Sequence, residues 1–149
     1  MLDTQQICEM LNDTIPNIQI CASNQLKLSD KPCYIIINTK PDTHPGEHWG
    51  SIFYKGSGDK VEYFCSLGRK MVDDTLSILC GYGITGYHYN TIQIQDLEST
   101  YCGFYSILYI LSKFLHNHHM DTILAPFARD LKSNDEICIT QIIKIIETI

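Results

Sequence analysis

The chain has 149 residues, of which 44% are hydrophobic and 19% are charged, and its formal net charge is −6. This length and composition exclude a disordered protein and predict a single globular domain over residues 1–149. The acidic balance disfavours DNA as a partner, because phosphate contacts need clustered Lys and Arg side chains.

A short helix is predicted at the start of the chain. Asp3 or Thr4 can cap its first turn, because their side-chain oxygens accept hydrogen bonds from free backbone N–H groups. Ile7, Met10 and Leu11 then recur on one face at helical spacing. We expect this face to pack against the core.

Four strands follow, separated by turn-rich segments and one helix. The first carries a continuous apolar run, which is typical of a strand buried on both faces. A glycine-rich hairpin loop at residues 56–59 joins the second strand to the third, and a helix that opens at Asp73 and Asp74 precedes the fourth. The strands are predicted over residues 32–38, 48–54, 60–66 and 87–95.

The strongest helix signal runs from Phe104 to Leu115. Its faces are apolar nearly all round, as expected for a central, buried helix, and Ser99 or Thr100 supplies its cap. One or two more helices close the chain, and we expect their isoleucines to be core material. These are Ile137, Ile139, Ile142, Ile143, Ile145 and Ile146. The predicted fold class is α+β, with a small, mostly antiparallel sheet packed on one central buried helix.

Seven cysteines are spread along the chain without a CxxC pair. An odd number leaves at least one thiol unpaired, and free thiols are typical of a reducing compartment. Residues 1–13 lack the basic stretch and apolar core of a signal peptide. The longest apolar stretch is too short and interrupted to span a bilayer, so we expect no membrane partner.

Cys102 is the candidate nucleophile. It lies at the first turn of the predicted central helix, where the helix dipole and free N–H groups favour the reactive thiolate. Gly103 removes a side chain beside the sulfur and lets a substrate backbone approach. The alternative interpretation is a buried core cysteine, the common fate of a free thiol.

Two further residues complete a candidate thiol-hydrolase site. His48 precedes Trp49 at the start of a predicted strand, where it can reach a helix N-terminus and act as base for a thiol. Gln95 lies seven residues before Cys102, and its amide can join the Cys102 N–H in an oxyanion hole. Taken singly, His48 is an ordinary polar strand residue and Gln95 carries no signal.

Three blocks of sequence together resemble the adenovirus protease (adenain) family. Residues 46–49 read Gly-Glu-His-Trp, residues 64–68 read Phe-Cys-Ser-Leu-Gly, and residues 95–103 read Gln-Asp-Leu-Glu-Ser-Thr-Tyr-Cys-Gly. The family carries Gly-x-His-Trp, Phe-[Asp/Glu]-x-x-Gly and Gln-x-x-x-Ser-x-x-Cys-Gly at these places. SUMO proteases share the architecture, but their glutamine usually sits six residues before the nucleophile, so the spacing here is more similar to adenain.

The resemblance implies a cysteine endopeptidase with Cys102 as nucleophile, His48 as base, Gln95 in the oxyanion hole and Cys65 at the third position of the triad. It implies a polypeptide substrate, namely capsid or core precursor proteins cleaved at Gly-containing sites, and it allows for an activating peptide. The expected location is the virion and the nucleus or cytoplasm of the host cell. No cofactor is expected. His116, His118 and His119 come without a ligand set of zinc spacing, so no metal is expected either.

Cys65 departs from the family pattern, which has Asp or Glu at this position. A neutral thiol is a weak acceptor, so the acid that orients His48 is missing, supplied from elsewhere, or unnecessary. Glu62 is near in sequence but points to the opposite strand face. Cys65 favours one alternative function, a catalytically weakened virion structural protein that kept the fold. A second alternative is a SUMO- or ubiquitin-type isopeptidase that uses the same residues on a Gly-Gly tail.

Overall fold

Five strands form one sheet in the order β1-β2-β3-β4-β5, in a computed structural model that describes residues 1–149. The central strands β2, β3 and β4 are antiparallel, whereas the edge strands β1 and β5 run parallel to their neighbours. The strands cover Gln19–Cys21 (β1), Cys33–Asn38 (β2), Trp49–Tyr54 (β3), Lys60–Phe64 (β4) and Gly86–Tyr89 (β5).

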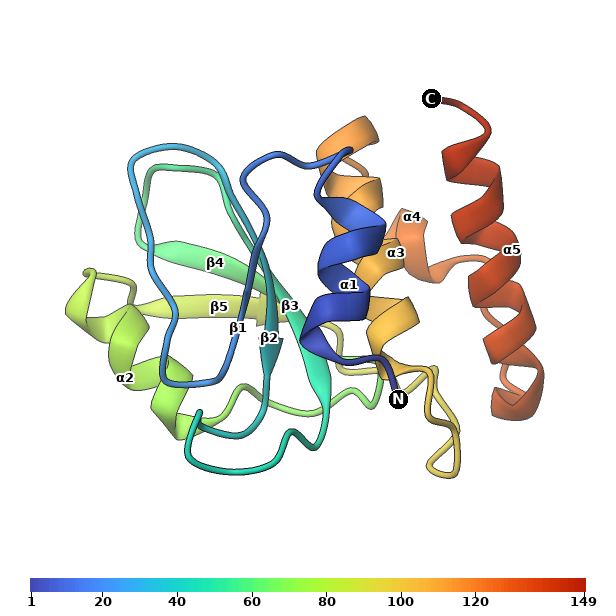
Figure 1. Ribbon diagram of the computed structural model, residues 1–149, viewed down its shortest axis with the longest axis horizontal. Helices are drawn as coiled ribbons and strands as arrows, with labels where there is room; N and C mark the ends of the chain where they lie inside the picture. The colour runs from blue at the N-terminus through green and yellow to red at the C-terminus, as the bar shows by residue number, and fades with distance from the viewer.

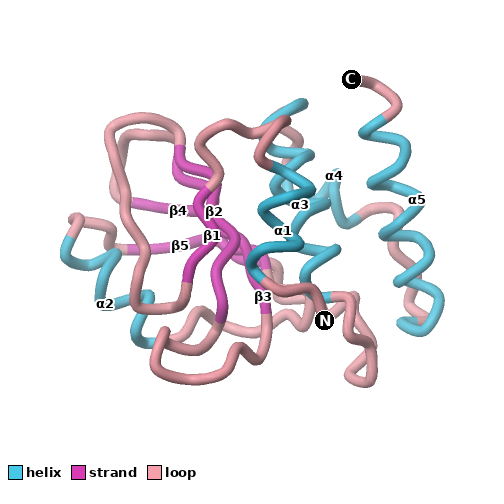
Figure 2. Tube along the Cα trace, in the orientation of Figure 1, coloured by secondary structure: helices cyan, strands magenta, loops and turns pink.

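Helices cover both faces of this sheet. Figure 1 shows α2 beside the sheet on one side and α1, α3, α4 and α5 on the other, and Figure 2 shows the strands gathered between them. The helices are α1 (Thr4–Leu11), α2 (Asp73–Gly81), α3 (Cys102–His116), α4 (Met120–Leu124), the 3-10 turn η1 (Leu131–Ser133) and α5 (Asn134–Ile146). None of them combines the length and the apolar character needed to cross a bilayer.

The sheet separates two hydrophobic cores. Ile36 and Phe64 point to the α3 side, and Ile35, Ile37 and Val61 point to the α2 side, because neighbouring residues of a strand alternate between faces. A strand between two cores must be apolar throughout, which explains the continuous run in β2. The predicted α+β class with a central buried helix is confirmed, and the parallel pairings at the two edges refine the mostly antiparallel sheet.

Several local predictions were wrong in detail. The fourth predicted strand, 87–95, ends early as β5, because the backbone N–H groups of Ile94 and Gln95 donate to Ser66 O instead of extending a ladder. Strand β1 was not predicted, since its three residues carry no pattern. The side chains of Met10, Ile143 and Ile146 are 44%, 50% and 52% exposed rather than core.

The start of α3 also differs from the expectation. Tyr101 is its N-cap residue and makes no side-chain capping bond. Ser99 lies two residues before this N-cap. Its hydroxyl accepts a hydrogen bond from Tyr101 N–H at 3.1 Å and donates to the Asp135 carboxylate at 2.8 Å. This contact fixes the loop that enters the helix without a conventional cap.

Candidate active site

Cys102 is the first residue of α3 and is only 3% exposed. Burial raises the pKa of its thiol, while the main-chain N–H groups of Trp49 and Gly103 oppose the rise. The helix N-terminus thus supplies N–H groups to the sulfur, as predicted. Desolvation outweighs those groups in its effect on the pKa, so the thiolate expected from the helix N-terminus stays a prediction.

His48 lies immediately before β3 and is 9% exposed. Its Nε2 is 3.4 Å from Cys65 Sγ. Burial, and then the Arg69 guanidinium, lower the pKa of His48 to about 4, and the Glu47 carboxylate opposes this. The imidazole is therefore neutral near pH 7 and is able to accept a proton.

The main chain brings His48 and Cys102 to the same place. The main-chain N–H of Trp49 lies near enough to Cys102 to lower the pKa of its thiol, and His48 is the residue that precedes Trp49. No hydrogen bond joins the two side chains, and Nδ1 of His48 has no partner within the chain while Nε2 faces Cys65. One ring nitrogen is thus held by a third residue and the other is left for a proton transfer, which is what a Cys–His pair requires.

Gln95 lies in the loop between β5 and α3 and is 2% exposed. Its Oε1 accepts a hydrogen bond from Ser66 Oγ at 2.5 Å, and its Nε2 donates to the Ser99 carbonyl at 2.9 Å. An amide nitrogen carries two hydrogens, so one remains for another acceptor. The contact with Ser66, next to Cys65, ties the loop before α3 to the end of β4.

Cys65 follows β4 directly and is 1% exposed. Asn90 holds its main chain on both sides: Cys65 N–H donates to Asn90 Oδ1 at 2.9 Å, and Asn90 Nδ2 donates to Cys65 O at 2.6 Å. Glu62 lies on the other face of the strand, as predicted, where its Oε1 is 2.8 Å from Lys113 Nζ. Cys65 is thus the side chain presented to His48, and Glu62 does not take the place of the acid.

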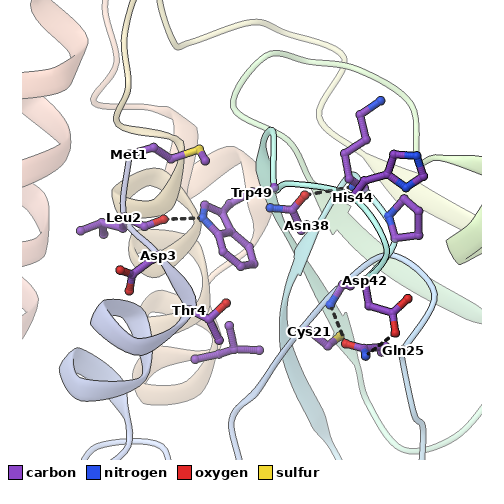
Figure 3. Close-up of a pocket in the computed structure, with 15 residues that line it drawn as sticks. Met1, Leu2, Asp3, Thr4, Cys21, Gln25, Asn38, Asp42, His44 and Trp49 are labelled. Atoms are coloured by element: carbon purple, nitrogen blue, oxygen red, sulfur yellow. Dashed lines mark hydrogen bonds between the residues drawn. The ribbon is translucent and has the colours of Figure 1, made fainter.

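The N-terminal residues cover the first turn of α3. Figure 3 shows the Leu2 carbonyl accepting a hydrogen bond from the Trp49 indole, with a length of 2.8 Å. The Leu2 side chain lies so close to Gly103 that a Cβ there would be 3.0 Å from Leu2 Cβ. A cavity of about 390 Å³ opens beside Trp49, between this segment and residues such as Asp42 and His44. Leu2 therefore covers Gly103, the residue that follows Cys102.

Sequence reasoning missed two residues that hold the loop carrying Gln95. Asp135, in the first turn of α5, accepts hydrogen bonds from Ser99 Oγ and from Tyr105 Oη, the latter at 2.9 Å. Asn134 is fully buried and donates to Ile94 O at 2.8 Å. An Asn-Asp pair at a helix start indicates capping, and nothing in the sequence shows that Asn134 bonds to Ile94, 40 residues earlier, or that Asp135 bonds to Ser99.

Comparison with known proteins supports the fold. No protein-family model matches the chain, and no curated protein matches its sequence. The crystal structure of the selenomethionine form of ASFV pS273R protease is similar, with a TM-score of 0.54 and 18% identity, over 87% of this chain and 63% of that chain. A second ASFV pS273R protease structure matches with a TM-score of 0.44 and 24% identity, over 70% and 42% of the two chains. This chain thus spans less than two thirds of that protease and shares its fold.

Proposed function

We propose that this chain is a thiol-dependent peptide hydrolase in which Cys102 is the nucleophile and His48 the base. One observation carries the proposal: the turn into β3 delivers His48 and the Trp49 N–H to the N-terminus of the buried helix on which Cys102 lies. The fold shared with a protease supports it.

The chemistry follows from the free groups of the site. His48 Nδ1 takes the proton of Cys102 as Sγ bonds to the substrate carbonyl carbon. The free N–H of Gln95 and the Cys102 N–H are the proposed donors to the oxyanion. When the peptide C–N bond breaks, His48 returns the proton to the leaving amine. Water then hydrolyses the thioester with the same base and restores the thiol.

The finer assignment is a proposal by resemblance to adenain. The substrates would be structural precursor proteins of a virus, cut at Gly-containing sites in the virion or in the nucleus or cytoplasm of the host. A site with a neutral thiol and a neutral imidazole has to be activated when substrate or an activating peptide binds. A Gly-Gly tail of a ubiquitin-like protein is the competing substrate, so both substrate types belong in one assay.

A second candidate function is a non-catalytic structural protein. Cys65 in place of an acid and the lowered pKa of His48 favour it, because both weaken a thiolate–imidazolium pair. A folded chain that cleaves neither Gly-containing peptides nor Gly-Gly tails would support this alternative.

Labelling of Cys102 tests the proposal directly. A peptide probe with a thiol-reactive group, followed by mass spectrometry, should modify Cys102 faster than Cys33 or the equally buried Cys138. His48→Gln should slow labelling by about 10²-fold, because a positioned base contributes at least that much. If Cys102 reacts no faster than Cys138, or if His48→Gln changes nothing, the assignment of the pair is wrong.

A further inference from the structure

A second cavity lies on the Cys65 side of the His48 ring and has a volume of about 160 Å³. Its wall includes the side chains of His48, Cys65, Tyr63, Arg69 and Lys70. Cys102 does not line it, so an occupant would touch the base without obstructing the nucleophile. The cavity is therefore a separate site next to the one already described.

The charges around this cavity are unbalanced. Lys40 and Glu47, which also line it, form an exposed ion pair with an Nζ–Oε2 distance of 3.2 Å. Arg69 and Lys70 form no ion pair with any carboxylate of the chain. The cavity thus has two cations without a carboxylate partner, while its one acid, Glu47, is paired with Lys40. The Arg69 charge disfavours the protonated form of His48.

A neutral donor completes the cavity. Tyr63 is 3% exposed, and burial together with the adjacent Cys65 raises the pKa of its hydroxyl, which stays protonated. The hydroxyl lies over Gly50, where a Cβ would be 2.8 Å from it. Tyr63 thus adds a neutral hydroxyl to the residues that line the cavity, beside an ammonium and a guanidinium. A guanidinium fork matches a carboxylate.

We propose that this cavity binds a carboxylate, which gives His48 the negative neighbour that Cys65 cannot provide. The carboxylate lies between the Arg69 guanidinium and the His48 ring and stays unprotonated. When the Cys102 proton moves to His48 Nδ1, the imidazolium forms next to an anion that also balances the Arg69 charge, which favours the transfer. The role in activation rests on the proposed function, whereas the binding does not.

Titration of His48 by NMR tests the binding without any assay of activity. The His48 ring signal, assigned with His48→Gln, is followed against pH in increasing sodium formate at ionic strength held constant with sodium chloride. We expect formate to raise the pKa of His48 saturably by about 1, the lower end of the effect of a neighbouring opposite charge. A response that is absent, or that chloride alone reproduces, overturns the proposal.

Variants of the cavity sharpen the result. Cys65→Ala enlarges the site and should increase the response of the His48 pKa to formate. Cys65→Asp places an acid beside His48 and should abolish this response. Arg69→Gln removes the guanidinium and should abolish the response as well. Arg129→Gln, which removes the other exposed arginine, is the matched control for net charge and should respond like the parent. An undiminished response in Arg69→Gln contradicts the proposal.

Two further experiments distinguish the source of the carboxylate and separate binding at the cavity from its effect on catalysis. An amidated Glu-containing tripeptide in place of formate distinguishes a protein side chain from a free acid, and saturation by either supports the carboxylate site. Formate should also raise kcat/KM by about tenfold in Cys65→Ala, the equivalent of one pKa unit. If formate binds but no peptide is cleaved, the carboxylate site is supported and the proposed hydrolase function is wrong. If peptides are cleaved but neither ligand has an effect, the hydrolase function is supported and the carboxylate site is wrong.

Discussion

At the scale of single residues, His48 is a buried base whose surroundings disfavour its charged form. Burial and Arg69 act together against its charged form, and only Glu47 acts in the other direction. Cys65 adds contact but no charge. The histidine is thus a base without an acid, and its titration affects the stability of the fold as well as catalysis.

We expect stability to fall as the pH is lowered from about 6.5 to about 4. In this window the unfolded chain binds a proton at His48 and the folded chain does not, because the folded pKa is about 4. The slope attributable to this one group is up to about 1.4 kcal/mol per pH unit. Urea unfolding of the parent and of His48→Gln isolates it, and parallel curves for the two proteins would contradict the lowered pKa.

Gln95→Ala should lower kcat by about 10²-fold or more and leave KM nearly unchanged, because an oxyanion donor acts on charge that appears only in the transition state. Gln93 is an unsuitable control, since its side chain donates to Gln95 O. Ser66→Ala is better matched: it removes the contact to Gln95 Oε1 and keeps the Nε2 donor. Equal losses of kcat in both variants would make Gln95 a structural residue.

At the scale of elements, the first turn of α3 is where the site is closed. Leu2, which precedes α1, lies on Gly103 and is fixed by the Trp49 indole. The elements α1, β3 and α3 therefore meet at the thiol. The residue after Cys102 is thus covered by a segment about 100 residues away in the sequence.

Leu2→Gly should increase the rate of Cys102 alkylation severalfold, because it uncovers Gly103 and the neighbouring sulfur. Trp49→Phe should act in the same direction by removing the hydrogen bond to the Leu2 carbonyl. Iodoacetamide labelling followed by mass spectrometry measures the rate of alkylation, and the buried Cys138 serves as a control within the same molecule. Unchanged rates in both variants would show that Leu2 does not restrict the thiol.

At the scale of the whole molecule, an ion pair between buried Lys113 and partly buried Glu62 joins the sheet to the central helix. Lys113 is 6% exposed, and its Nζ lies 2.8 Å from Glu62 Oε1 on β4. Tyr109 Oη also donates to Glu62, and Lys113 lies over the Phe53 ring, 5.5 Å from its centroid. These contacts fix the register between β4 and α3, and hence the position of Cys102 relative to the end of β4.

Glu62→Ala should destabilise the fold by about 3 kcal/mol, because it leaves the Lys113 ammonium buried without a partner. The double variant Glu62→Gln with Lys113→Met should cost less, since no buried charge is left. Glu47→Ala breaks the exposed Lys40–Glu47 pair and should change stability by less than about 1 kcal/mol. Urea unfolding measures all three, and equal effects of Glu62→Ala and Glu47→Ala would contradict a stabilising role of the buried pair.

The elements and the order of the site residues could be predicted from the sequence, because these features are local. The apolar run of β2 and the apolar surface all round α3 are patterns of neighbouring residues. They were sufficient to predict the α+β class and the position of Cys102 at a helix start. Local patterns did not reveal that Ile143 and Ile146 face solvent, since a helical repeat shows only that a face is apolar and not what covers it.

Only the tertiary structure decided which groups contact the site residues and how far these residues are removed from water. The contact of His48 with Cys65, the cover of Leu2 over Gly103 and the reach of Asp135 to Ser99 each join segments distant in sequence. The charge states of Cys102 and His48 depend on how much water the assembled elements exclude. Desolvation is a property of the whole packed environment, so a dipole argument made on one helix does not include the burial that raises the pKa of the Cys102 thiol.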